Sequence, residues 1–500
     1  MVVGMFMAIL DIQIVASSLA EIQAGIGASR EEISWIQTSY LIAEVIIIPL
    51  SGWAAHVLST RWLFTVSAVM FTAASAACAF AWSLESMIVF RSLQGFLGGA
   101  MIPTVFATSY ALFPKHRQAG VTVIIGLVAT MAPTLGPSLG GWLTDTFSWH
   151  WLFLINIVPG AIVAAVVFST LDVDRPNLGL LKGFDLPGVV LVAVFLGTLQ
   201  FVLEEGPGED WFDSGEIVLF TAASALAAIG FFWRELTVKN PVVDLHAFAN
   251  PNFALGCFYS FVIGVGLYGS VYVMPLYLAM VRGYTALEIG WVIMVTGAFQ
   301  FLSAPVAGAL SNKIDPRAML AIGLALFGGG LYMNHTLTAD WGYWEFFLPQ
   351  AVRGFALMFL FIPVNALALG DLPPAMLKGG SGLYNLMRNL GGAIGLAVIN
   401  TALTERMDLH MARLAESLTA ARPAVTQAVD GLTATLAPAL GADAHLAGLK
   451  TLGLLVQREA AVLAFADVFQ LMALVFVAGL LFMPAMRKVD LHGDAASEAH

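Results

Sequence analysis

Charged residues are scarce in this sequence. Of its 500 residues, 11% are Asp, Glu, Lys or Arg and 59% are hydrophobic, which gives a mean hydropathy of +0.84. Soluble domains carry about 25% charged residues, so a soluble domain is excluded. The apolar runs are continuous over the roughly 20 residues that a membrane-spanning helix needs, and they lack the alternation of barrel strands. We therefore predict an all-α polytopic membrane protein.

Basic residues, cysteines and nucleotide- or metal-binding motifs are also few or absent. The 22 Lys and Arg against 33 Asp and Glu leave a net charge of -11, so no basic surface exists to bind nucleic acid. Cys78 and Cys257 lie in separate apolar runs and are expected to be buried small residues rather than a disulfide or metal pair. The sequence has neither a GxxxxGK(S/T) phosphate loop nor an HExxH pair. We expect a protein that is not an enzyme and has no cofactor or metal site.

The apolar runs predict fourteen transmembrane helices. The run from Met1 is interrupted by Asp11 and has no convincing cleavage site, so we expect a first membrane helix rather than a signal peptide. The helices are predicted at residues 1–19, 33–55, 62–82, 87–112, 119–140, 150–170, 187–203, 216–233, 253–280, 287–311, 318–335, 344–369, 380–403 and 465–486.

The distribution of Lys and Arg orients these helices, because cytoplasmic loops are enriched in both. An even number of spans places both termini on one side, and the opposite short loops hold only Arg30 and Arg282. Long loops translocate largely regardless of charge, so the segment 405–464 is not counted. We predict cytoplasmic termini and a cytoplasmic side that carries Arg61, Lys115, Arg117, Arg175, Lys182, Arg234, Lys239, Lys313, Arg317, Lys378, Arg487 and Lys488.

The chain contains an internal repeat. The link "SGWAAHVLSTRWLF" resembles "AGALSNKIDPRAML", and three landmarks recur in the same order. Their offsets are nearly constant: 256 for Gly52 and Gly308 and for Arg61 and Arg317, 260 for Pro103 and Pro363, and 255 for Gly136 and Gly391. Such repeats are typical of secondary transporters. We predict a six-helix bundle in 1–170, two intervening helices in 171–252, and a second six-helix bundle in 253–500 with a long periplasmic segment at 405–464 and a cytoplasmic tail.

Several motifs resemble those of the major facilitator superfamily, specifically its 14-helix drug:proton antiporters of the EmrB/QacA type. They are "LDIQIVASSLAEIQ" from Leu10, "RSLQGFLGGA" from Arg91, "APTLGPSLGGWLTD" from Ala132 and "WHWLFLINIVPG" from Trp149. The long outer segment 405–464 is most similar to the Gram-negative EmrB multidrug efflux subgroup.

The resemblance implies an inner-membrane permease that exports hydrophobic, often cationic compounds against protons by alternating access. It also implies a tripartite system with a periplasmic adaptor (a membrane fusion protein) and an outer-membrane channel. A permease of the same fold for a metabolite, lipid or siderophore stays open, because fold does not determine substrate.

Asp11 and Arg91 are the candidate proton-coupling pair. Charges inside a membrane are costly and are by default functional, and a buried carboxylate can load or release a proton as its surroundings change. The resemblance assigns Arg91 to proton transfer, because Gln94 and Gly95 also match. A fixed ion pair in a structural hydrogen-bond network is the alternative.

Polar residues within the spans are the candidates for the substrate cavity. The 256 offset carries Asp11 to Leu267 and Glu44 to Gln300, so the second bundle lacks both acids and proton chemistry is expected in the first bundle. Glu44 is either a substrate or proton contact or a glutamate with no direct role. The candidates are Glu44, Gln13, Gln94, Gln300 and Tyr268.

The fifth predicted helix carries an antiporter motif. Small residues at helical spacing let backbones approach closely and prolines bend helices. The resemblance associates this combination with antiport, and generic close packing is the alternative. The motif residues are Pro133, Gly136, Pro137, Gly140 and Gly141.

The two copies of the cytoplasmic link depart from the superfamily pattern, which has Gly, three residues, an acid, a base, one residue, Gly, one residue and a base. In the first copy His56 takes the acid position and Ser59 the second Gly position, while Gly52 and Arg61 remain. We hypothesise that His56 makes the family's charge-relay latch pH-sensitive; a drifted turn is the alternative.

The second copy also lacks the usual carboxylate. Asn312 takes the acid position and Asp315 the second Gly position, whereas Gly308, Lys313 and Arg317 remain. The outer segment 405–464 has apolar residues at helical spacing and a break at Pro423, which suits either a docking surface for the adaptor or a helical cap.

Overall fold

The computed structural model describes residues 1–29, 32–311, 313–419 and 421–486. Arg30, Arg487 and Lys488 of the loop count, Asn312 of the second link, and the tail beyond residue 486 lie outside this part of the chain. The described residues form α-helices joined by 3-10 turns and loops, without a β-strand.

The helices of the first bundle precede two intervening helices. The first bundle comprises α1 (Val2–Ala16), α2 (Leu19–Ile26), α3 (Trp35–Leu58), α4 (Thr60–Ala79), α5 (Leu84–Leu112), α6 (Lys115–Thr146), α7 (Trp151–Leu154) and α8 (Ile157–Thr170). The intervening helices are α9 (Leu186–Glu205) and α10 (Gly215–Thr237).

The helices of the second bundle end in a long hairpin. They are α11 (Pro251–Met280), α12 (Ala286–Ser311), α13 (Pro316–Tyr332), α14 (Tyr343–Leu369), α15 (Leu377–Glu416), α16 (Pro423–Leu440) and α17 (Ala444–Leu481). In the described part of the chain, 13 helices are long and apolar enough to cross a membrane, and 14 if the bent pair α1–α2 is one span. The predicted all-α membrane fold is confirmed.

The first predicted span, at residues 1–19, contains a bend. α1 ends at Ala16, and α2 continues at an angle of 71°. Two serines stand at the bend: the Ser17 hydroxyl donates to the carbonyl of Ile14 at 2.9 Å, and Ser18 leaves helical geometry at φ -129°. Serine side chains that bond to nearby backbone compete with the helix in this way.

The outer segment predicted at 405–464 is helical, and its helices are continuous with the two spans that flank it. α15 is 40 residues long and α17 is 38, and at 1.5 Å per residue each is about twice the roughly 30 Å of a bilayer core. No Pro or Gly interrupts 396–416, so α15 continues past the predicted end at residue 403. The expected break at Pro423 is confirmed, because this proline begins α16.

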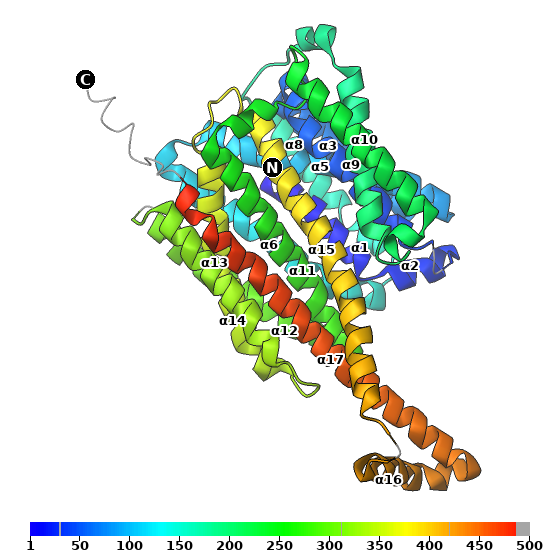
Figure 1. The fold of residues 1–500 in the computed structure, drawn as a ribbon. Coiled ribbons are helices and arrows are strands. Elements are labelled where there is room, and N and C mark those ends of the chain that lie inside the picture. The colour runs from blue at the N-terminus through cyan, green and yellow to red at the C-terminus, as the bar shows by residue number, and fades with distance from the viewer. Residues whose placement is uncertain (30–31, 312, 420, 487–500) are drawn as a thin grey trace.

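α16 packs against the part of α17 that extends beyond the bundle (Figure 1). Val429 of α16 is buried, and Gly448 of α17 lies against Thr433. The outer segment is therefore a helical hairpin that carries a short third helix. We call this extremity the protruding end and the opposite one, at the α3–α4 link, the link end.

The packing repeats with the sequence. α3 packs on α5 and α4 packs on α8 in the first bundle, as α12 packs on α14 and α13 on α17 in the second. The bundles meet along α3–α15 and along α6–α12, two interfaces that the repeat relates, and α9 covers α3 from outside. Figure 1 shows the two bundles side by side, with α9 and α10 against the first.

Candidate functional site

A buried ion pair lies inside the first bundle. Arg91 of α5 donates to the Oδ2 atom of Asp11 of α1, and both side chains are 0% exposed. Arg91 also donates to Gln94 Oε1 at 2.7 Å and to the backbone oxygen of Ile36 at 3.2 Å. The structure thus brings together three of the predicted residues, Asp11, Arg91 and Gln94.

Two residues that sequence reasoning missed complete this network. Gln94 Nε2 donates to Asp11 Oδ1 at 2.9 Å and to the Ser75 hydroxyl at 2.6 Å. Asn156 Nδ2 donates to the same two oxygens at 2.8 Å and 3.1 Å. An asparagine inside the motif "WHWLFLINIVPG" was the available signal for Asn156. All donors to Asp11 therefore belong to the first bundle.

Aromatic rings surround the guanidinium of Arg91. Its Cζ atom lies 4.3 Å from the ring centre of Tyr40 and 5.8 Å from that of Phe153. A Cβ atom at Gly95 would lie 2.3 Å from the carbonyl oxygen of Tyr40, so only glycine lets α3 and α5 approach this closely. Cation-π contacts and three polar partners offset part of the cost of burying this charge.

Glu44 occupies a different environment, at the interface between the bundles. Its side chain, on α3, is 2% exposed and packs against Gly99 of α5. It forms a hydrogen-bonding contact with Asn389 of α15, whose Oδ1 atom accepts from the Tyr268 hydroxyl at 3.5 Å. Arg91 of the first bundle and Arg388 of the second lie within electrostatic range of it, and Glu44 forms no ion pair with a described residue. Two predicted cavity residues, Glu44 and Tyr268, thus share one cluster.

Gln300 occupies the corresponding place on the other interface. Its side chain, on α12, is fully buried and donates from Nε2 to the hydroxyl of Thr130 on α6. Its Oε1 atom has no partner among the described residues. Gln300 does not contact the Glu44 cluster, so the structure does not gather the predicted cavity residues into one site.

The second bundle holds two buried arginines without an ion-pair partner in the described chain. Arg388 Cζ lies 5.2 Å from the ring of Phe106, 5.4 Å from that of Phe361 and 5.7 Å from that of Tyr384. Arg353, 3% exposed, lies 5.8 Å from the ring of Phe327, and its Nε and Nη1 atoms have no hydrogen-bond partner among the described residues. Unlike Arg91, neither faces a carboxylate at bonding distance.

The antiporter motif packs α6 onto α1. A Cβ atom at Gly136 would lie 2.3 Å from Gln13 Cβ, and one at Gly140 would lie 2.7 Å from the oxygen of Ile14. Pro133 and Pro137 lie within the helix, and Gly141 O accepts from Thr144 at 3.0 Å. Gln13 therefore packs against the motif rather than joining a polar cluster.

At the link end, the carboxylate that the first link lacks comes from a residue far along the chain. Asp174, in the segment between α8 and α9, accepts from the backbone N–H of Thr60 at 2.9 Å and so caps α4. It also pairs with Lys378 of α15, whose Nζ donates to the oxygen of Ala55 at 3.0 Å. His56 is half-buried near Lys378 and Asp174. Nothing in the sequence indicated this role for Asp174.

Close backbone contact accompanies this ion pair. A Cβ atom at Gly52 of α3 would lie 2.7 Å from the Cα of Gly379 on α15. Ser59 adopts φ 75° and ψ 154°, a conformation that favours glycine and explains the family's Gly at this position. Arg61 does not face α15; its guanidinium lies 4.7 Å from the ring of Phe168 on α8.

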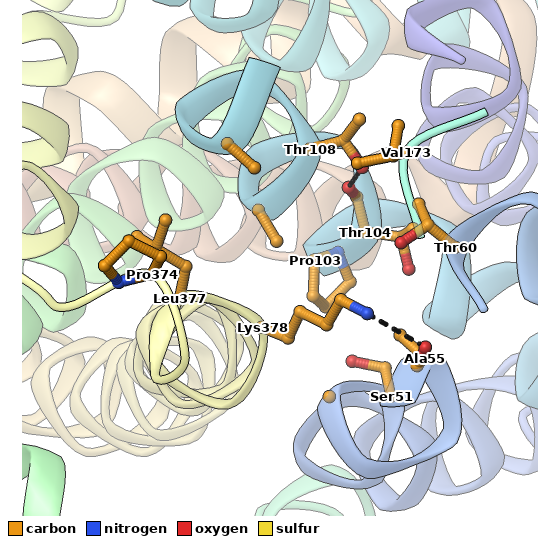
Figure 2. A pocket seen from close by; sticks show the side chains of 13 residues that line it. Ser51, Ala55, Thr60, Pro103, Thr104, Thr108, Val173, Pro374, Leu377 and Lys378 are labelled. Atoms are coloured by element: carbon orange, nitrogen blue, oxygen red, sulfur yellow. Dashed lines mark hydrogen bonds between the residues drawn. The ribbon is translucent and has the colours of Figure 1, made fainter. Parts of the chain in front are cut away.

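A small pocket opens beside the Lys378 contact (Figure 2). It lies where α3, α5 and the first turn of α15 meet, and none of the predicted cavity residues lines it. The lining residues are Ser51, Gly52, Ala55, Thr60, Pro103, Thr104, Ala107, Thr108, Ala111, Val173, Pro374, Leu377 and Lys378.

The second link caps its own helix. Asp315 accepts from the backbone N–H of Arg317 at 2.9 Å and pairs with the Arg317 side chain, which donates to Met486 O at 3.1 Å. Gly308 packs against Val123 of α6, and Lys313 is exposed. In both links a carboxylate therefore caps the helix that follows. Asp174, from a distant segment, caps α4, whereas Asp315, from the link itself, caps α13.

Comparison with known proteins identifies relatives over nearly the whole chain. A family model described as Major Facilitator Superfamily matches residues 1–396. The colistin resistance protein EmrB of Acinetobacter baumannii is 43% identical over 483 residues, which cover 96% of this chain and 94% of that protein. The multidrug export protein EmrB of Escherichia coli is 31% identical over 440 residues, which cover 87% and 86%.

A solved structure shares the fold. The proton:xylose symporter XylE superposes with a TM-score of 0.62 at 12% sequence identity, covering 98% of this chain and 95% of that one. At this identity the likeness establishes the arrangement of helices and not the cargo.

Proposed function

The chain belongs to the major facilitator superfamily, and from that premise we propose that it is an inner-membrane, proton-coupled multidrug efflux permease that exports hydrophobic, often cationic compounds by alternating access. The names of the relatives, which are multidrug export and colistin resistance proteins, support this cargo class. The observation that carries the mechanism is the fully buried Asp11–Arg91 pair.

The proton site in this proposal is Asp11. A carboxylate in the membrane interior is costly as an anion, and here one cation and two amide groups offset that cost. A proton on Asp11 would remove the attraction to Arg91 and leave the amides of Gln94 and Asn156 to re-pair. Arg91 thereby sets how readily the proton leaves.

The same proposal orients the protein. The link end carries most of the basic loop residues and faces the cytoplasm, while α16 and the hairpin α15–α17 extend into the periplasm. In this orientation the structure has its cytoplasmic ends in contact, through Gly52 against Gly379 and through Lys378 with Asp174. The protruding hairpin is then placed to meet a periplasmic adaptor that leads to an outer-membrane channel.

Reconstituted liposomes test this function. We expect uptake of lipophilic cations into inside-out vesicles when a pH gradient is imposed, and its loss in Asp11→Asn. Asp213→Asn, at an exposed position between α9 and α10, is the matched control and should transport as the unmodified protein does. Coupled uptake that survives Asp11→Asn would contradict the proton-site assignment, and uptake of neutral metabolites alone would favour a specialised permease.

A further inference from the structure

The repeat relates one buried polar residue at each interface between the bundles, Glu44 and Gln300, and of these two only Glu44 can ionise. Glu44 of α3 faces Asn389 of α15, and 256 positions later Gln300 of α12 faces Thr130 of α6. Both side chains are buried, at 2% and 0% exposure. Protonation can therefore change the charge at the α3–α15 contact but not at its counterpart.

The Asp11 network cannot by itself distinguish two arrangements of rigid bundles. Its carboxylate receives hydrogen bonds from Arg91, Gln94 and Asn156, which all belong to the first bundle. Alternating access in such folds is largely rigid-body rocking of one bundle against the other. A bound proton shifts the equilibrium between the two arrangements only through interactions that differ between them. Hydrogen bonds within one rigid bundle are the same in both arrangements, so they contribute equally to both.

The contact of Glu44 does differ between the two states, because its partners move with the other bundle. Asn389 and Arg388 lie on α15 and Tyr268 lies on α11. Hydrogen bonds to a charged group are roughly twice as strong as neutral ones, so the ionised carboxylate holds α3 and α15 together more firmly than the protonated acid does.

Arg388 adds to this preference. Its guanidinium lies among Phe106 of the first bundle and Phe361 and Tyr384 of the second, so its surroundings are complete only when the link ends are in contact. The other charged or titratable groups that face Glu44 are Arg91 of α5 and Tyr40 of its own helix. The acid Glu205 of α9 faces Thr38, at 2.9 Å, instead.

We propose that Glu44 is the acid through which proton binding is coupled to the relative position of the two bundles. The inference rests on the proposed antiport and adds to it the residue that converts protonation into movement. Ionised Glu44 favours the arrangement with the link ends in contact. A proton that arrives from the protruding end neutralises Glu44, weakens the α3–α15 contact and favours opening at the link end.

The test measures the distance between the bundles rather than transport. Spin labels at Leu58→Cys, at the end of α3, and Ala375→Cys, in the exposed turn before α15, report the separation of the two link ends. The background replaces the buried Cys78 and Cys257 by Ala. On acidification we expect the ratio of long to short distances to rise about five- to tenfold, the difference between a charge-assisted and a neutral hydrogen bond.

Three variants and one control decide the result. Glu44→Gln should show the acidic distribution at every pH, and Asn389→Ala, which keeps the acid, should reduce the response. Asp11→Asn and the control Glu205→Gln should retain it. A response that survives both Glu44→Gln and Asn389→Ala, or that disappears only in Asp11→Asn, would overturn the proposal.

If Glu44→Gln does not fold, Asn389→Ala alone decides, and an unchanged response in it would overturn the proposal. The failure of the proposed function is separable, because it would appear as absent proton-coupled transport in liposomes while the pH-dependent distance change remains.

Discussion

The α3–α15 and α6–α12 interfaces are related by the internal repeat, yet different chemistry holds them together. The first has Glu44 against Asn389 in its middle and the Asp174–Lys378 ion pair at the link end. The second has the amide of Gln300 on Thr130 and the packing of Gly308 on Val123. The repeat gives two related surfaces, and in our proposal the ionisable groups on the α3–α15 surface make it respond to protons, whereas the α6–α12 surface does not.

A second contrast concerns buried arginines inside the bundles. Arg91 forms an ion pair with Asp11. Arg353 of the second bundle lies near the ring of Phe327, and its Nε and Nη1 atoms have no hydrogen-bond partner among the described residues. The first bundle therefore holds a compensated charge pair and the second an uncompensated cation. The predictions below test these contrasts in order of expected effect.

Removing Arg91 should have the largest effect. Arg91→Met leaves Asp11 buried without its cation, which costs about 3 to 5 kcal/mol. Arg353→Met is the matched control and should change the free energy of unfolding by less than about 1 kcal/mol, because it removes an unpaired buried charge. Denaturant unfolding followed by the fluorescence of the 12 tryptophans measures both. Equal destabilisation by the two variants would contradict the contrast between the bundles.

Breaking the ion pair at the link end should have an intermediate effect. Asp174→Asn weakens both the contact with Lys378, whose partners are 19% and 22% exposed, and the cap on Thr60. A partly exposed ion pair is worth about 1 kcal/mol, and this pair, unlike the cap on Thr60, joins the two bundles, so the open population at the link end should rise roughly fivefold.

The labels at positions 58 and 375 measure this population directly. Asp172→Asn, two residues away and exposed, is the control and should leave the distances unchanged. An equal response in both variants would show that Asp174 does not join the bundles.

Exchanging the acid between the interfaces should have the smallest effect on stability and the most specific effect on pH dependence. The double variant Glu44→Gln/Gln300→Glu keeps one acid but places it against Thr130. We expect a pH-dependent distance change to return, now between α6 and α12, with a net cost of about 1 kcal/mol for one altered buried hydrogen bond. If the double variant folds but its distances do not change with pH, an acid at the interface between the bundles is not sufficient, and Arg388 is also required for the pH response.

Much of the fold could be predicted from the sequence because the membrane makes apolar length a direct signal. Local apolar runs predicted the positions of the spans, and a constant offset predicted the repeat. A recognisable motif predicted the pairing of Asp11 with Arg91. The bend at Ser17 and the continuation of α15 to Glu416 were missed because a hydrophobic window ends where the membrane ends and not where the helix does.

The sequence alone therefore determined that this chain is a duplicated helical transporter whose second bundle lacks acids at the positions that correspond to Asp11 and Glu44. Only the tertiary structure decided which acids act within one bundle and which lie between the two. Asp174 replaces the carboxylate missing at His56 and caps Thr60, which lies 114 positions earlier in the sequence. Glu44 faces Asn389, which lies 345 positions later. Contacts between distant segments depend on how helices pack, and no local pattern encodes that packing.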